Sequence, residues 1–177
     1  MKFILTIIVL SFVLVGRAEE ELAHHKGFSV MYDHDARIPH WVFYTWTPAN
    51  AIERCKRLSG FAMDPILNSV STRLYTNTGY DRGHMVPAED RQSDPELMRE
   101  TFYTSNIIPE VPAINRGIDK KMEEYHRKVP ARYAIFVGVV YSSDSPRVNG
   151  ITIPNEKYRV VINTDTGDVK VFRFKNE

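Results

Sequence analysis

The alternation of apolar and polar residues predicts two β-strands near the start of the chain. Apolar residues alternate with small or polar ones across 27–32, and aromatic and β-branched side chains dominate 41–46. Both patterns are typical of strands. The turn-forming residues of 33–39 predict a hairpin loop between them. The polar segment 19–26 is expected to be a mobile lead-in.

A second group of strands is predicted in the last third of the chain. The run 133–141 is apolar almost throughout, which is typical of a central strand buried on both faces. A shorter strand is predicted at 151–154. The segments 157–163 and 168–174 flank the turn formers of 164–167, and this arrangement predicts a second hairpin.

The middle of the chain predicts short helices separated by a long loop. Thr47 before a proline, a sequence resembling a capping box at Ser93, and a stretch rich in Lys, Glu and Met are all helix signals. They predict helices over 48–56, 93–99 and 113–127. The segment 57–80 lacks periodicity and is predicted to be a long loop, and such loops are commonly functional. A strand is predicted at 101–105.

The first 18 residues differ in composition from the rest of the chain. Lys2 precedes an apolar run over 3–15, and small residues then lead into an acidic segment. This pattern predicts a secretory signal peptide over 1–18, followed by a single domain over 19–177. A membrane anchor is the alternative, but the run is shorter than the roughly 20 residues that span a bilayer. We therefore expect a secreted or periplasmic protein, without stable membrane association after cleavage.

Charge and cysteine content restrict the classes of function. The 177 residues contain 23 Lys and Arg against 22 Asp and Glu. Cleavage after residue 18 would lower the first number to 21, because it removes Lys2 and Arg17. Binding of nucleic acid through bulk positive charge is therefore excluded, and any polyanion site must be a local basic patch. Cys55 is the only cysteine, so an intramolecular disulfide is excluded. It falls in the helix predicted over 48–56, which favours burial.

Candidate chemistry is concentrated between Thr78 and Asp90. Within four residues this stretch places a carboxylate, a guanidinium and an imidazole, at Asp81, Arg82 and His84. An imidazole has an ordinary pKa of about 6.5, so the neutral ring can act as a general base near physiological pH. The alternative is a surface loop in which these side chains are merely solvated.

The run Tyr80 to Ala88, reading Tyr-Asp-Arg-Gly-His-Met-Val-Pro-Ala, resembles the signature of the DNA/RNA non-specific endonucleases. Three further blocks occur in the order found in that family: 57–64, 105–109 and 115–123. The resemblance implies an α+β ββα-metal (His-Me finger) nuclease fold, with a central antiparallel sheet flanked by helices. It also implies a metal-dependent, sequence-non-specific endonuclease that acts on DNA, and on RNA where the site tolerates the 2′-hydroxyl.

The resemblance assigns roles within the motif and upstream of it. His84 is the expected general base, Asp81 orients the motif, and Arg82 binds substrate beside the scissile phosphate. Arg57 matches an upstream arginine of the family that offsets negative charge, although Arg54 and Lys56 are rivals for this assignment. Asn106 is expected to support the site by hydrogen bonding and is counted among the substrate-binding residues.

The resemblance also implies a metal site in the segment 113–127. Asn115 matches the family's metal ligand, and its amide oxygen suits Mg²⁺, for which Mn²⁺ can substitute. Glu123 is expected to act through neighbouring groups, with Glu124 as the alternative register. A helix N-cap is the other reading of Asn115. A solvated side chain paired with Arg127 is the other reading of Glu123.

Two other functions are compatible with these residues. The first is a secreted nucleic-acid-binding protein that kept the fold and lost turnover. The second is a phosphoesterase that acts on small substrates. The aromatic residues of 41–46 could stack on bases, but such residues in a strand more often belong to the core.

Overall fold

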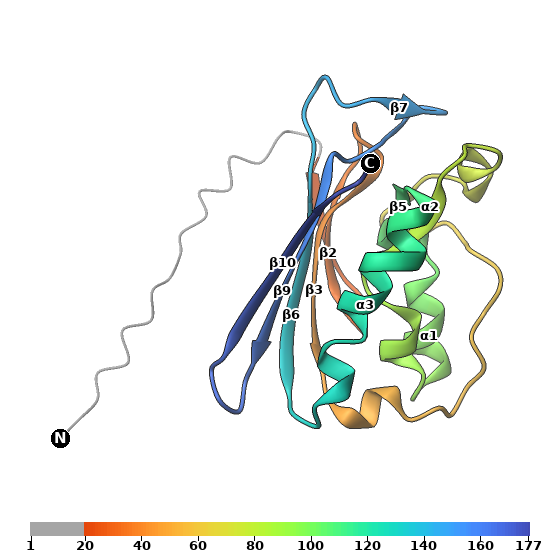
Figure 1. Cartoon of the computed structure of the whole chain (residues 1–177). Coiled ribbons are helices and arrows are strands. Elements are labelled where there is room, and N and C mark those ends of the chain that lie inside the picture. Colours follow the sequence, from red (N-terminus) through yellow and green to blue (C-terminus); the bar gives the residue numbers. More distant parts are fainter. Residues whose placement is uncertain (1–19) are drawn as a thin grey trace.

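The computed structural model describes residues 20–177, so the predicted signal peptide lies outside the described residues. Its main feature is a six-stranded antiparallel sheet in the order β1-β2-β3-β6-β9-β10 (Figure 1). The strands are β1 (Glu20–His24), β2 (Ser29–Asp33), β3 (Ile38–Trp46), β6 (Tyr133–Val140), β9 (Glu156–Asn163) and β10 (Val169–Lys175). Both predicted hairpins are confirmed, and 133–141 is confirmed as a central strand.

Two small strand pairs accompany the main sheet. One joins β4 (Asp81–His84) to β5 (Ile107–Glu110), and the other joins β7 (Arg147–Val148) to β8 (Ile151–Thr152). Strand β4 contains the motif residues, and its register places His84 opposite Ile107. The chemistry-bearing motif is therefore a short strand held by backbone hydrogen bonds.

The helical segments lie on one face of the sheet (Figure 1). The α-helices are α1 (Pro95–Thr101), α2 (Pro112–Ile114) and α3 (Lys120–Glu123), with a π-helical turn at Asn115–Asp119. Turns of 3-10 helix occur at Pro48–Ala51, Thr72–Tyr75, Ala88–Arg91, Thr104–Asn106 and His126–Lys128. Within residues 20–177, no helix is long and apolar enough to cross a membrane.

The core lies between this face of the sheet and the β4–β5 pair. Val42, Tyr44, Ile135 and Val161 from the sheet are buried in one cluster with residues of the smaller pair such as Ile107. The opposite face stays open in the described part of the chain, where Phe43, Ile162, Val169 and Val171 are exposed. The expected helices therefore cover one face of the sheet and do not flank both.

Three predicted elements are wrong in the structure. Within the predicted lead-in, residues 20–24 instead form β1, because their backbone completes the hydrogen bonding of β2 and a polar strand is tolerated at a sheet edge. The helix predicted over 48–56 stops after one 3-10 turn, and the amides of Arg54 and Cys55 donate to the Gln92 carbonyl. Cys55 is consequently half-buried in an irregular segment.

The strand predicted at 101–105 is also replaced. Thr101 ends α1, and Thr104–Asn106 forms a 3-10 turn before β5. Helix α1 begins after its N-cap Asp94 and continues to Thr101, so the residues predicted as a strand belong to the end of this helix and to the turn that follows. The helix predicted over 113–127 is confirmed in position, with the π-turn as an unforeseen interruption.

Candidate active site

Six of the seven predicted site residues line one cleft of about 650 Å³. They come from three elements: the loop at 57–61, strand β4, and the helical segment that follows β5. They are Arg57, Asp81, Arg82, His84, Asn115 and Glu123. The surface-loop reading of the motif is therefore wrong, because its side chains converge with distant residues on a shared cavity.

His84 is held at the end of β4 with its ring in an aromatic setting. The ring lies 5.5 Å from the Phe61 ring and 5.1 Å from the Phe102 ring, measured between centroids. The residue is 7% exposed, and its Nε2 has no hydrogen-bond partner among residues 20–177. Burial, assisted by the positive charges of Arg57 and Lys157, lowers the pKa of His84 to about 3. The imidazole is thus neutral at physiological pH and can accept a proton.

The glycine within the motif is required by a close contact. A Cβ atom on Gly83 would lie 2.7 Å from the Glu110 Cβ, because Gly83 and Glu110 belong to paired strands that approach closely here. A real Cβ would therefore displace β5 or the buried Glu110 side chain. This packing explains why the residue between Arg82 and His84 has no side chain.

Asp81 fixes the orientation of Asn115. The Asn115 Nδ2 donates to Asp81 Oδ2 over 2.9 Å, and Arg116 donates to both Asp81 oxygens over 2.8 and 2.7 Å. The hydrogen bond from Arg116 is the main cause of the lowered pKa of Asp81, so the carboxylate stays ionised. The N-cap reading of Asn115 is wrong, since Val111 holds the N-cap position of α2. Its nitrogen is committed to Asp81, and its Oδ1 remains for another partner.

These residues fit a hard divalent cation. An amide oxygen is a suitable ligand, and Mg²⁺ keeps several waters, so it does not require a cluster of protein ligands. Residues 20–177 contain no group of three or more His, Cys, Asp or Glu that could hold a metal. A site based on Asn115 with Glu123 in the same cleft therefore agrees with Mg²⁺ better than with zinc.

Glu123 is largely removed from solvent. Its side chain is 15% exposed, and Arg127 Nη2 lies 3.9 Å from its Oε2. Burial and then the negative charge of Asp119 raise the pKa of Glu123 to about 8. The reading of Glu123 as a solvated surface residue is wrong, although the pairing with Arg127 exists. Glu124 also lines the cleft, so the choice between the two registers is not decided by position alone.

Two arginines of the cleft come from outside the helical segment: Arg57 from the loop at 57–61 and Arg82 from β4. Arg57 Nη1 lies 2.5 Å from Glu89 Oε1, and its guanidinium lies over the Phe102 ring. The Arg82 guanidinium lies over Phe61 and makes long hydrogen bonds to the Thr72 carbonyl and the Thr76 hydroxyl. Arg54 and Lys56 are absent from the lining, so Arg57 is the member of that block that faces the cleft.

Asn106 does not contact the cleft, and the expectation that it binds substrate is wrong. Its side chain is completely buried. It accepts a hydrogen bond from the Val86 amide and donates to the carbonyls of Val86 and Thr101. Because a buried amide must satisfy its polar atoms, it is used to hold the chain just after His84. Its role is to support the site from beneath.

Sequence reasoning missed several cleft residues. Three are cations of the helical segment, and one is an aromatic residue that precedes the motif: Arg116, Lys120, Arg127 and Tyr80. Helical spacing is the signal that could have found Lys120 and Arg127, since they lie three and four positions from Glu123 and share its face. Arg116 directly follows Asn115, and this spacing does not find it. Together with Arg57, these three cations form a local basic patch, which a chain of nearly balanced charge needs in order to bind a polyanion.

A family model described as DNA/RNA non-specific endonuclease matches residues 9–176 of the chain. The chain belongs to this family. The match covers the motif, the helical segment and both hairpins, so the resemblance inferred from four short blocks is confirmed over nearly the whole sequence.

Relatives of this nuclease-family chain include two mitochondrial proteins. The chain is 31% identical over 169 residues to "Nuclease 1, mitochondrial" of Schizosaccharomyces pombe, covering 90% of this chain and 51% of that protein. It is 32% identical over 126 residues to "Nuclease EXOG, mitochondrial" of Xenopus laevis, covering 69% and 34%. The chain thus spans about half of the length of the first relative and about a third of the second.

These relatives contradict the secreted or periplasmic location expected from the N-terminal segment. The expectation depended on an apolar run after a positive residue. Composition of this kind does not by itself define a compartment.

The fold also has a solved counterpart. A crystal structure of an EndoG/EndoGI complex contains a chain that superposes with a TM-score of 0.71 and 23% sequence identity, covering 88% of this chain and 74% of that one. The α+β fold class is confirmed. The order β4, β5, then the helical segment with Asn115 is the ββα unit that the resemblance implied.

Proposed function

We propose that this chain is a metal-dependent endonuclease that hydrolyses phosphodiester bonds of DNA without sequence preference, and those of RNA where the site tolerates the 2′-hydroxyl. The observation that carries the proposal is the convergence of His84 and Asn115 on one cleft from the strand and the helix of the ββα unit. Because His84 and Asn115 come from different elements of one cleft, a phosphate can lie between the proposed base and the proposed metal ligand.

His84 is the proposed general base. Its neutral ring accepts a proton from the water that attacks phosphorus, and the rings of Phe61 and Phe102 hold it in place. A pKa of about 3 makes the free imidazole a weak base. The negative charge of a bound phosphate opposes the effect of Arg57 and raises the proton affinity of His84 when substrate is present.

Mg²⁺ is the proposed cofactor, held through Asn115, and when bound it supplies charge stabilisation for the phosphoryl oxygens and the departing 3′-oxygen. Asp81 keeps the Asn115 oxygen directed away from its own carboxylate by accepting from Nδ2. Departure of the 3′-oxygen leaves a 5′-phosphate on the second product.

The cations of the cleft support a substrate that is a polyanion. Arg57, Arg82, Arg116, Lys120 and Arg127 all line it. Phosphate contacts carry no sequence information, so a site built from them cuts without sequence preference. The planar forks of the arginines suit phosphate oxygens, and Arg57 is proposed to offset the charge that builds up during attack.

A plasmid-nicking assay tests this function. Wild type should nick supercoiled DNA with Mg²⁺ and stop when a chelator is added, and digestion of long RNA would extend the activity to ribose. His84→Ala should lower the rate by about 10²–10⁴-fold, the usual contribution of a general base. His34→Ala is the matched control, because His34 contacts Glu21 outside the cleft.

Equal cleavage by wild type and His84→Ala would remove His84 from the mechanism. An intact plasmid that nevertheless binds wild type would favour the alternative of a nucleic-acid-binding protein without turnover. Cleavage of small phosphodiesters but neither polymer would favour the phosphoesterase.

A further inference from the structure

Lys157 is a buried cation behind the cleft that the proposed mechanism does not use. It lies on β9, where the side chains of alternate residues point into the core, and it is 1% exposed. Burying an ammonium is unfavourable unless its charge and its three N–H groups are satisfied. Its partners therefore indicate why a cation is kept at this position.

Lys157 binds both of the elements that carry the proposed base and the proposed metal ligand, His84 and Asn115. Its Nζ donates to the His84 carbonyl oxygen over 2.8 Å and to Asp119 Oδ2 over 2.5 Å. The first acceptor belongs to β4, and the second ends the π-turn that begins at Asn115. The carboxylate of Glu110 on β5 is an ion-pair partner, with its Oε1 3.5 Å from Nζ. One ammonium group thus joins the main sheet to all three pieces of the ββα unit.

The charge of Lys157 is secured by its neighbours. Burial by itself would lower the pKa of Lys157, but the carboxylates of Asp119 and Glu110 outweigh burial and raise it. The ammonium is therefore charged throughout the physiological range. An apolar side chain of similar length could fill the space, but it could not connect the His84 carbonyl to the carboxylates of Asp119 and Glu110.

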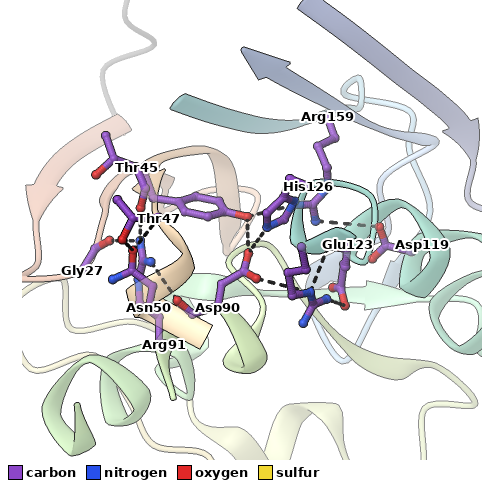
Figure 2. A network of polar contacts seen from close by, with 12 residues as sticks. Gly27, Thr45, Thr47, Asn50, Asp90, Arg91, Asp119, Glu123, His126 and Arg159 are labelled. Carbon is purple, nitrogen blue, oxygen red and sulfur yellow. Dashed lines mark hydrogen bonds and ion pairs between the residues drawn. The ribbon is translucent and has the colours of Figure 1, made fainter. Parts of the chain in front are cut away.

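A second cation of β9 holds the same carboxylate. Figure 2 shows Arg159 directed toward Asp119, and Arg159 Nη2 lies 4.0 Å from Asp119 Oδ1. Arg159 Nη1 donates to the Tyr44 hydroxyl, which in turn donates to Asp90. Within residues 20–177, the hydrogen bonds and ion pairs of Arg159 go to Tyr44 and Asp119 and not to β4, so of these two cations it is Lys157 that links β4 to the π-turn.

We propose that Lys157 is a positioning residue that sets the separation between His84 and Asn115, by holding the backbone of β4 and the end of the π-turn on one ammonium group. This inference depends on the proposed function for its catalytic consequence. Displacement of a reacting group by about 1 Å can lower a rate by about 10²-fold, so a buried tie of this kind controls turnover without touching substrate.

Three variants separate positioning from mere stability. Lys157→Met removes the ammonium, but it leaves two buried carboxylates with less compensation and is expected to lower the midpoint of thermal unfolding. Lys157→Met/Asp119→Asn removes one charge of each sign and restores the balance. Arg91→Met is the matched control, because Arg91 is a buried cation whose donors go to the carbonyls of Gly27, Thr45 and Asp90 (Figure 2).

Two measurements are made at a temperature where all the proteins are folded. The first is kcat and KM for a short duplex with Mg²⁺. Both Lys157 variants should lose about 10²-fold in kcat with little change in KM, because the cleft cations that bind phosphate remain. Arg91→Met should lower the unfolding midpoint and keep kcat.

The second measurement is the NMR titration of the His84 ring without metal or substrate. The charge of Lys157 adds to burial and Arg57 in lowering the pKa of His84. Loss of this charge should move the His84 midpoint to higher pH in both Lys157 variants, whereas Arg91→Met should leave it unchanged. The acidic limb of the pH–rate profile should move in the same direction, since the base must be neutral to act.

The outcomes are distinguishable. Wild-type kcat and an unchanged His84 midpoint in Lys157→Met/Asp119→Asn would overturn the inference and leave the proposed function intact. A wild type that cuts neither DNA nor RNA would reject the proposed function. In that case the NMR titration of His84 still tests Lys157: a midpoint at higher pH in both Lys157 variants supports the inference, and an unchanged midpoint overturns it.

Discussion

At the scale of single residues, the motif divides into side chains that face the cleft and one position where a side chain is forbidden. Asp81, Arg82 and His84 line the cavity, whereas Gly83 faces the buried Glu110 across the strand pair. The glycine has an extended backbone with no need for a positive φ, so its role is close approach and not a special turn. Spacing in the motif is therefore a packing requirement as much as a chemical one.

Gly83→Ala tests this packing. The new Cβ must displace Glu110 or β5, and such overpacking should lower the free energy of unfolding by about 1–3 kcal/mol. Gly60→Ala is the control, because a Cβ there meets nothing within 4 Å and the change should stay within about 0.5 kcal/mol. Urea denaturation of the two variants makes the comparison. Equal stabilities would show that the β4–β5 contact relaxes freely.

At the scale of elements, the site depends on short segments fixed by specific hydrogen bonds. Strand β4 has four residues, and the helical segment after β5 is divided by a π-turn between Asn115 and Asp119. Elements this short are not stable by propensity alone. They persist because side chains such as Asn106 and Lys157 bind their backbone or their ends.

Helix α1 shows the same dependence in a form that is simple to measure. Asp94 Oδ1 accepts from the amides of Glu96 and Leu97, which satisfies two donors at the helix start. Asp94→Ala should lower the free energy of unfolding by about 1 kcal/mol, the usual value of an N-cap. Asp94→Asn keeps the acceptor and loses only the exposed ion pair with Lys26, so thermal unfolding should separate the two variants. If both were equally destabilised, the charge and not the cap would account for the loss.

At the scale of the whole molecule, the sheet has one covered face and one open face in the described part of the chain. Val161 on β9 is 1% exposed, whereas Val171 on neighbouring β10 is 65% exposed. The two positions have the same residue type in adjacent strands of one hairpin. The Val161 side chain points to the face that the helices and the β4–β5 pair cover, whereas the Val171 side chain points to the open face.

The pair Val161→Ala and Val171→Ala measures the value of that layer. Val161→Ala removes buried methyl groups and should lower the free energy of unfolding by about 1–3 kcal/mol, whereas Val171→Ala should change it by less than about 0.5 kcal/mol. Chemical denaturation of both variants gives the comparison. A large loss at Val171 would mean that the open face is covered in solution.

The sequence alone determined the strands of both hairpins, the motif and six of the residues that line the cleft. Strand patterns of this length are read from side-chain alternation, which is local. The proposed roles of Asn115 as a metal ligand and of His84 as a base follow from residue chemistry and from the family resemblance. None of these inferences required knowledge of how distant segments meet.

Only the tertiary structure decided which partners the buried polar side chains have, because those partners lie far away in the sequence. Asn106 looked like a substrate contact and is a buried support, because the direction of its amide depends on the carbonyls of Val86 and Thr101. In the sequence, Lys157 is only the first residue of the strand predicted over 157–163. It became a link between the walls of the cleft only when β9, β4 and the π-turn were brought together, since a buried charge acquires its role from partners that lie far apart in sequence.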